Sequence, residues 1–327
     1  MASTISIHNE HSIGHPTMKD LLTVIIPVHN EAQWLPETLH SVQNQTLGNI
    51  KILIGDNASS DCSQEIIAQA AKLDKRINYV LRQANIGAVE NVADLVQRCE
   101  TPFISFIGAH DLVDQDWAKA LTDLLRGNPS VSLAYSRISW IDGHGKFFKE
   151  TDGGDFVRNE EFPFQRIIAC ISHQWHECTA VNGVFRASIL KSFWFPKVYG
   201  PDHVLLARSS YLGKISRIER PLYFRRELDR QSVYIKRIMG NSRLWVAPGI
   251  DSLIAAFIVD LLLLEGTAAL TLAKYSEYRH ALRSGYGRQS MPTMARVAAW
   301  MIYILLTSGI LGNRTYCRRS LCQNADY

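Results

Sequence analysis

Acidic side chains follow short apolar runs of the sequence, and together they could bind a cation or the hydrogen-bond donors of a polar ligand. Asp56 and Asp61 follow the run that ends at Gly55, and Asp111 follows the run that ends at Ile107. Like charges gather at one place only where a cation or donor groups compensate them. A lone Asp after a strand more often caps the next helix. We expect these carboxylates to face one binding site if the chain brings the ends of the runs together.

The elements that must position these residues alternate between strand-like and helix-like patterns. Apolar runs typical of buried strands occupy residues 21–30, 50–55, 77–81 and 103–107, and helical periods occupy residues 31–43, 62–73 and 88–99. Repeated βα units predict an α/β fold with a doubly wound, mostly parallel sheet. Ligands bind beyond the carboxyl ends of such strands, and the acidic residues stand at those ends.

The composition fits a globular protein and excludes other classes. The chain has 327 residues, of which 46% are hydrophobic and 20% charged, so disordered and collagen-like chains are excluded. Its six cysteines include no CxxC pair, so neither a disulfide framework nor a zinc ribbon is expected, and a reducing compartment is favoured. Residues 1–20 lack the pattern of a secretory signal and are expected to form a flexible polar arm. A cytoplasmic location is predicted.

Positive charge is concentrated in two stretches. Lys214–Arg243 holds nine Lys or Arg against three acidic residues, and Thr271–Tyr327 holds eight against two. These stretches favour an anionic partner, either a phosphate-bearing ligand or an anionic membrane surface, with solvated helix faces as the alternative. The uncharged residues 297–313 fall short of the ~20 residues that cross a bilayer. They predict a helix lying at the inner face of the cell membrane, or a buried helix, within a helical C-terminal extension over residues 241–327.

Six segments together resemble one known family. In chain order they are VIIPVHNEAQWLPETLHSVQNQT, ILIGDNASSD, NIGAVENV, FIGAHDLVDQDW, AVNGVFRASIL and GPDHVLLARSSYLGKISRIERPLYFRR. Their order and spacing, from about Leu22 to Ser232, resemble the family 2 nucleotide-sugar glycosyltransferases, which have the Rossmann-like GT-A fold. The resemblance implies a catalytic domain over residues 21–240, with a nucleotide half at 21–112 and an acceptor half at 113–240.

The resemblance implies a pocket for the nucleotide of an activated sugar, such as a UDP-sugar. In the family, the loop after the first strand and the acidic residue after the second hold the base and the ribose, and a later segment closes over the nucleotide. The residues at these positions are Pro27, His29 and Glu31, then Asp56 and Asn57, then Arg82, Gly87 and Asn91. A carboxylate can accept the hydrogen bonds that a base edge donates, and glycine allows a close backbone approach.

The resemblance also implies a divalent cation, Mg²⁺ or Mn²⁺. The family places an Asp-x-Asp-Asp type motif where this chain has Gly108-Ala109-His110-Asp111. Asp111 is the carboxylate that remains as a metal ligand, and His110 would favour Mn²⁺. The departing diphosphate needs further positive charge, for which Arg230 is the first candidate, with Arg225 and Arg226 beside it.

Asp202 resembles the catalytic Asp that begins a helix near the acceptor, although Pro201 replaces the Glu that normally precedes it. Such a carboxylate would deprotonate the acceptor hydroxyl in an inverting transfer. A helix N-cap is the alternative role for Asp202. His173, His176 and Cys178 could suggest zinc, but structural zinc needs four ligands at defined spacings. An acceptor-pocket loop, with Trp175 stacked on a sugar, is the preferred interpretation, and a plain packing role for the loop is the alternative.

We therefore predict an inverting glycosyltransferase that uses a nucleotide-sugar donor and a glycan or lipid-linked acceptor, with no nucleic-acid partner. Its product would belong to a surface polysaccharide or a lipid-linked glycan. The alternative is a nucleotide-sugar-binding protein of the same fold whose catalysis is impaired, because Gly108 and His110 depart from the metal motif. A nucleotidyltransferase is disfavoured because the first strand is not followed by a glycine-rich phosphate loop.

Overall fold

A computed structural model of the chain describes residues 6–7, 20–151, 157–172, 178–196 and 200–228. Four expectations fall mainly or wholly outside these residues: the polar arm, the Trp175 loop, Arg230 and the C-terminal extension. Among the described residues, no helix is both long enough and apolar enough to cross a bilayer.

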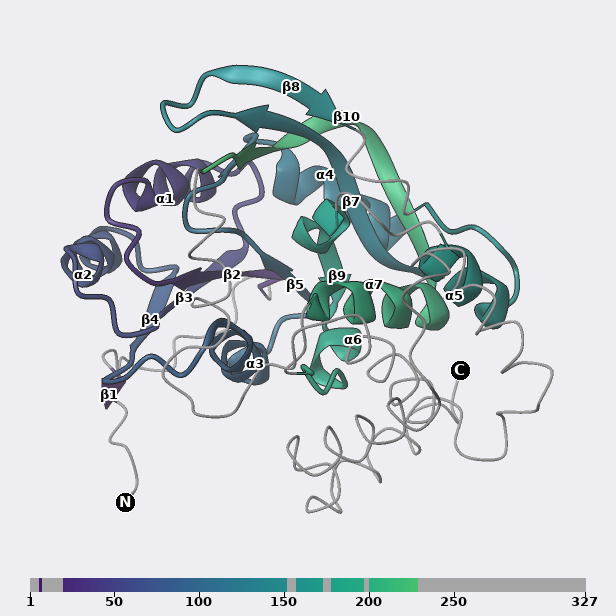
Figure 1. Cartoon of the computed structure of the whole chain (residues 1–327), viewed down its shortest axis with the longest axis horizontal. Coiled ribbons are helices and arrows are strands. Elements are labelled where there is room, and N and C mark those ends of the chain that lie inside the picture. Colours follow the sequence, from purple (N-terminus) through teal and green to yellow (C-terminus); the bar gives the residue numbers. More distant parts are fainter. Residues whose placement is uncertain (1–5, 8–19, 152–156, 173–177, 197–199, 229–327) are drawn as a thin grey trace, which may run out of the picture.

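The first half of the described chain alternates strands and helices, as the sequence predicts (Figure 1). Its elements are β1 (Ser6–Ile7), β2 (Leu22–Val28), α1 (Leu35–Gln43), β3 (Ile50–Asp56), α2 (Ser63–Leu73), β4 (Ile77–Leu81), α3 (Ala88–Arg98) and β5 (Phe103–Phe106). Strands β4, β3, β2 and β5 are adjacent and parallel. The helix expected from residue 31 begins at Leu35, because residues 31–34 form a turn and Pro36 suits the first helical turn.

The second half extends the sheet with a mixture of strand directions. Its elements are β6 (Leu112–Val113), α4 (Trp117–Gly127), β7 (Val131–Ile141), β8 (Phe147–Thr151), α5 (Pro163–Ser172), a 3₁₀ turn (Cys178–Asn182), β9 (Val184–Arg186), α6 (Ala187–Lys191), α7 (Pro201–Leu212) and β10 (Lys214–Arg226). The order across the sheet is β1-β4-β3-β2-β5-β9-β7-β10-β6, and β8 pairs with β7. Strand β9 runs antiparallel to both neighbours, whereas β7 and β10 are parallel.

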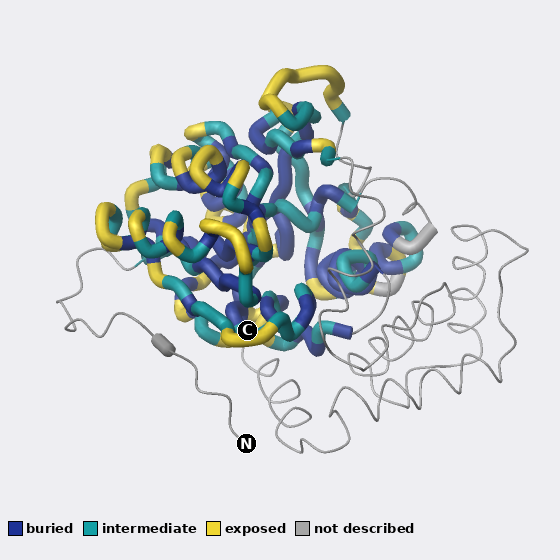
Figure 2. The backbone as a smooth tube through the Cα atoms, turned by 60° about the vertical axis from the view of Figure 1, so that its left-hand side comes forward, coloured by how far each residue is buried: buried dark blue, intermediate teal, exposed yellow. Residues whose placement is uncertain are grey.

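Two hydrophobic clusters cover the two faces of this sheet. Along β2, Val24 and Ile26 belong to one cluster and Ile25 to the other, because successive side chains of a strand point to opposite faces. The first cluster includes buried side chains of α1, α2 and α4, and the second includes those of α3, α5, α6 and α7. Figure 2 shows the buried residues concentrated inside these layers. The sheet is therefore fixed from both sides, and its strand ends can position a site.

Candidate active site

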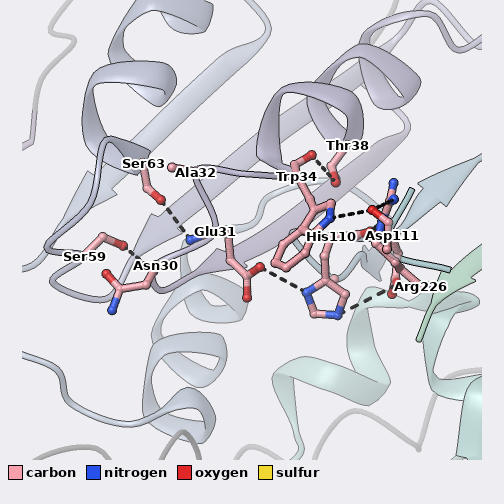
Figure 3. Close-up of polar contacts among 12 residues, drawn as sticks. Asn30, Glu31, Ala32, Trp34, Thr38, Ser59, Ser63, His110, Asp111 and Arg226 are labelled. Carbon is pink, nitrogen blue, oxygen red and sulfur yellow. Dashed lines mark hydrogen bonds and ion pairs between the residues drawn. The ribbon is translucent and has the colours of Figure 1, made fainter. Parts of the chain in front are cut away.

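The parallel pairing of β2 with β3 brings their carboxyl ends together. Val28 lies opposite Asp56 in the register of the two strands. The loops that follow are joined by hydrogen bonds: Ser59 Oγ accepts the Asn30 amide at 2.9 Å, and Ser63 Oγ accepts the Glu31 amide at 3.0 Å (Figure 3). The expected convergence of the strand-end loops is thus present. Pro27 is half-buried within β2, opposite Gly55.

Asp56 is fully buried at the end of β3, and one of its oxygens is unused. Its Oδ1 accepts the Ser59 amide at 3.1 Å and Nε2 of Gln64 at 2.8 Å. Its Oδ2 is buried and has no hydrogen-bond partner among the described residues. Because buried polar atoms are nearly always paired, this oxygen marks a position where a ligand could donate a hydrogen bond.

Both carboxylate oxygens of Asp61 accept hydrogen bonds from backbone amides. Its Oδ2 accepts the Ala32 amide and its Oδ1 accepts the Ser63 amide, both at 3.0 Å. The carboxylate therefore stabilises the start of α2 and the neighbouring loop. The helix-start alternative describes these contacts, and a role of Asp61 toward a ligand stays a prediction.

Asn57 joins the loop after β3 to the loop after β4, and its predicted contact with the nucleotide stays a prediction. Its Oδ1 accepts the Ile86 amide and its Nδ2 donates to Oδ1 of Asn85, both at 2.9 Å. Asn85 Nδ2 lies 3.2 Å from Nε2 of His29, so the loop after β4 is held against the loop after β2. The sequence analysis missed Asn85, although it lies in the quoted NIGAVENV segment.

Arg82 and Asn91 anchor α3 to the sheet. Nε of Arg82 donates to Oδ1 of Asn91 at 2.8 Å, and its Nη2 reaches Asp94 Oδ2 at 2.7 Å. Asn91 is fully buried and donates from Nδ2 to the Gly55 carbonyl at 2.8 Å. Gly87, which precedes α3, has φ 95°, a conformation that favours glycine. The two polar side chains position the closing segment.

His110 lies between two carboxylates beyond the end of β5 (Figure 3). Its Nδ1 is 3.3 Å from Oε2 of Glu31, and its Nε2 is 3.9 Å from Oδ1 of Asp111. Glu31 and Asp111 are both buried, and His110 is partly exposed. The loop after β2 and the loop after β5 therefore contribute to one polar cluster.

Asp111 is held by β10, which pairs with β6 directly after Asp111. Tyr223 donates its hydroxyl to Asp111 Oδ2 at 2.7 Å, and the Arg226 amide donates to Oδ1 at 2.8 Å. Burial, together with the negative charge of Asp111, raises the pKa of Tyr223 well above its usual value, so the hydroxyl keeps its proton. The sequence analysis did not single out Tyr223, although it lies in the quoted segment that ends at Arg226, because it is 112 residues away from Asp111.

Arg225 and Arg226, near the end of β10, differ in burial and in the groups that they contact. The guanidinium of Arg226 is buried and bound to the His110 carbonyl at 2.8 Å and to Glu37 Oε2 at 2.6 Å, so it is a structural group. Arg225 is half-buried and lies over the Trp140 ring, 5.1 Å from its centroid.

A divalent cation fits the cluster around His110. Nε2 of His110 and Oδ1 of Asp111 are close enough to approach one ion with small side-chain movements. Metal-binding histidines usually have their other ring nitrogen paired with a carboxylate, and Glu31 occupies that position. A carboxylate has about four lone-pair sites, so the two bonds from Tyr223 and Arg226 leave acceptor capacity on Asp111.

Asp202 lies in the first turn of α7, in a second cluster. Gly200, with φ 71°, is the N-cap residue, and no side chain caps this helix. Asp202 is therefore not the N-cap of α7, and the alternative role suggested by the sequence is wrong. The carboxylate oxygen of Asp202, Sγ of Cys178 and a ring nitrogen of His203 lie within 4.8 Å of one another.

Arg225 is within electrostatic reach of both clusters. Burial raises the pKa of Tyr223, beside Asp111, and that of Cys178, beside Asp202, and the positive charge of Arg225 opposes the increase in each. A guanidinium in that position suits an anionic group placed between the two clusters.

Comparison with known proteins agrees with this arrangement. Residues 23–194 match the sequence model of the family described as "Glycosyl transferase family 2". Glycosyltransferase GlyG of Streptococcus pneumoniae is 24% identical over 48% of this chain and 52% of its own length. A Bacillus subtilis protein, TuaG, whose name proposes a role in teichuronic acid biosynthesis, is 30% identical over 30% of this chain and 39% of its own length. The matches thus span about half or less of these relatives.

Solved structures of low sequence identity share the fold. Staphylococcus aureus TarS 1-349 in complex with UDP-GlcNAc has a TM-score of 0.52 at 17% identity, over 92% of this chain and 88% of that chain. The mannosyltransferase PcManGT of Pyrobaculum calidifontis, in complex with GDP-Man and Mn²⁺, has a TM-score of 0.51 at 14% identity, over 93% and 84%. The predicted GT-A fold is confirmed.

Because the family match covers more than half of the sequence, the chain belongs to glycosyl transferase family 2.

Proposed function

We propose that this protein transfers a sugar from a nucleotide diphosphate to an acceptor hydroxyl, with inversion at the anomeric carbon. The observation that carries the proposal is the buried, unpaired Oδ2 of Asp56 at the carboxyl end of β3. In a doubly wound sheet this is where a nucleotide binds. An N–H of the base or a ribose hydroxyl would donate to that oxygen, and the loops containing His29, Asn57 and Gly87 would surround the nucleotide.

The donor is proposed to be a UDP-sugar. The TarS complex contains UDP-GlcNAc and the PcManGT complex contains GDP-Man, so the shared fold accepts more than one nucleotide sugar. A single carboxylate oxygen suits one N–H donor, as on the edge of uracil. Thermal stabilisation by UDP-, GDP- and dTDP-sugars, compared at equal concentration, would identify the base.

The diphosphate would lie between the His110 cluster and Arg225. His110 Nε2 and Asp111 Oδ1 would hold Mg²⁺ or Mn²⁺, with Mn²⁺ preferred because one of the ligands is an imidazole. When bound, the ion would neutralise negative charge on the leaving diphosphate. Glu31 orients the imidazole, and Arg225 supplies a second positive charge. Arg230 stays a further candidate for this role.

Asp202 is the proposed general base. Its carboxylate would take the proton of the acceptor hydroxyl as the acceptor oxygen forms its bond to the anomeric carbon. The bond between that carbon and the diphosphate oxygen breaks on the opposite face of the sugar, which inverts the configuration. The bonding electrons leave with the nucleotide diphosphate, so one base is sufficient.

The acceptor is proposed to be a glycan or a lipid-linked glycan at the cytoplasmic face of the cell membrane. The name of TuaG links one relative to a cell-surface polymer. The basic stretch Lys214–Arg243 would favour an anionic acceptor or an anionic surface.

The test is release of nucleotide diphosphate from a panel of nucleotide sugars, measured with and without Mn²⁺ and with and without a glycan acceptor. We expect release that the acceptor stimulates. Tight donor binding without release under any condition would contradict the transferase and support the second candidate, a nucleotide-sugar-binding protein with impaired catalysis. The glycine at position 108 and the histidine at position 110 are the observations that favour this candidate.

A further inference from the structure

A thiol, an imidazole and a carboxylate meet at the start of α7. Cys178 begins the 3₁₀ turn Cys178–Asn182, and Asp202 and His203 lie in the first turn of α7. Sγ of Cys178 is 3.2 Å from each ring nitrogen of His203. The carboxylate of Asp202 completes a group whose donor atoms lie within 4.8 Å of one another. All three residues are half-buried, so the group is close to the surface.

These donor types and distances suit zinc. Zn²⁺ bonds of about 2.3 Å to thiolate, about 2.0 Å to imidazole and about 2.1 Å to carboxylate place tetrahedral ligand atoms roughly 3.3–3.6 Å apart. The separation of 3.2 Å between Cys178 and His203 is close to that range, but Sγ lies equally far from both ring nitrogens and so faces the ring. Rotation of the imidazole would turn one nitrogen toward an ion bound to the thiolate, and rotation of Asp202 would bring in its carboxylate. One thiolate and one carboxylate also balance the charge of the ion. Three protein ligands would leave a fourth position open to water or another ligand.

We propose that Cys178, Asp202 and His203 form a zinc-binding site, and that zinc and catalysis compete for Asp202. The second part rests on the proposed function. A carboxylate that has bound Zn²⁺ cannot also accept the proton of an acceptor hydroxyl. This site differs from the His110 cluster in its ligands, because the thiolate of Cys178 selects softer ions than a Mg²⁺ or Mn²⁺ site does.

Binding is tested on the full chain, stripped of metal with a chelator and then titrated with Co²⁺ as a spectroscopic substitute for Zn²⁺. A thiolate bound to Co²⁺ gives a charge-transfer absorption band. We expect this band to saturate at one ion per chain and to disappear when Zn²⁺ is added. The Cys178→Ser and His203→Gln variants should lose it, and circular dichroism would show that each variant is folded.

Matched controls use the other cysteines. The exposed Cys62, and Cys317 and Cys322, which are close to each other in the sequence, could bind Co²⁺ adventitiously. The Cys62→Ser variant and the Cys317→Ser, Cys322→Ser double variant are therefore compared. Both controls should keep the band. Absence of a thiolate band in the unmodified chain, or a band that survives in Cys178→Ser, would overturn the zinc site.

Competition is tested by the ratio of transfer rates with and without Zn²⁺ in each protein. The unmodified chain should lose at least tenfold in rate at saturating Zn²⁺ and recover on chelation, whereas the Cys178→Ser ratio should change by less than twofold. Inhibition by Zn²⁺ should weaken as the acceptor concentration increases. It should not change with the concentration of the sugar donor. Equal inhibition of both proteins would overturn the competition. If no transfer is found, the absorption titration still decides whether zinc binds, so failure of the two proposals can be distinguished.

Discussion

The carboxylate of Glu31 lies 3.3 Å from Nδ1 of His110, whose other ring nitrogen is turned toward Asp111 (Figure 3). This contact joins the loop after β2 to the loop after β5, across 79 positions of sequence. It fixes the direction of the imidazole at the point where the family normally has acidic residues. In the proposed cation site, the imidazole would therefore be a ligand in place of a carboxylate.

Replacement of Glu31 should weaken metal binding and leave the fold intact. In Glu31→Gln the side chain keeps its size but loses the charge that favours the proton on Nδ1 of His110. Loss of such a supporting carboxylate typically costs about 10–100-fold in metal affinity. Electron paramagnetic resonance of free Mn²⁺, in the presence of nucleotide diphosphate, would measure the change. Glu65→Gln, in the first turn of α2, is the control and should bind Mn²⁺ as the unmodified chain does. Equal affinity in the two variants would remove Glu31 from this role.

Replacement of Asp202 should abolish transfer while donor binding is retained. Asn cannot accept the proton of the acceptor hydroxyl, and loss of a general base typically costs about 10²–10⁴-fold in rate. The rate of transfer and the donor Kd should be measured on the same preparation of Asp202→Asn. Asp123→Asn, an exposed change in α4, is the matched control and should alter neither quantity. A transfer rate in Asp202→Asn within about twofold of the unmodified chain would exclude Asp202 as the base.

The ion pair between Asp74 and Arg76 should make stability depend on pH. The hydrogen bonds from Arg76 hold the pKa of Asp74 below its usual value of 3.8. The folded pKa is lower than the unfolded one, so the carboxylate stabilises the fold above about 3.8 and this contribution is lost as the pH falls through the folded pKa. Asp74→Asn should cost about 1–2 kcal/mol in free energy of unfolding at neutral pH.

Urea unfolding of the unmodified chain and Asp74→Asn at neutral and acidic pH measures this effect. The difference between the two proteins should shrink once the pH falls below 3.8. A difference that stays constant with pH would show that the pair contributes through packing and not through charge. Asp123→Asn again serves as the control, because exposed pairs such as Asp123 with Lys119 contribute about 0–1 kcal/mol.

The sequence predicts the elements of residues 22–106 well, because burial and periodicity coincide there. The alternating elements between Leu22 and Phe106 are found within a few residues of their expected bounds. Strands β4, β3, β2 and β5 run in one direction, so their carboxyl ends lie along the same edge of the sheet. Asp56 and Asp111 are therefore found at strand ends, as predicted.

Contacts between distant segments could not be predicted in this way. Tyr223 and Arg226 reach Asp111 because β10 pairs with β6, where Phe224 lies opposite Leu112, and no local pattern records this pairing. Asn57 and Asp61 have residue types that suit ligand binding, but neighbouring backbone amides use them. Cys178 meets His203 across 25 positions, so the group proposed to bind zinc does not appear in any short stretch of the sequence.

The proposed function is tested most directly by the effect of Asp56 on binding of a nucleotide sugar. In Asp56→Asn the amide oxygen would turn to Ser59 and Gln64. This leaves an NH₂ group at the position where Oδ2 is proposed to accept a hydrogen bond from the nucleotide. The account predicts that a UDP-sugar raises the Tm of the unmodified chain and of Asp61→Asn, and that the Kd of Asp56→Asn is at least tenfold weaker. Equal stabilisation of Asp56→Asn, or no stabilisation of the unmodified chain by any nucleotide sugar of the panel, would contradict it.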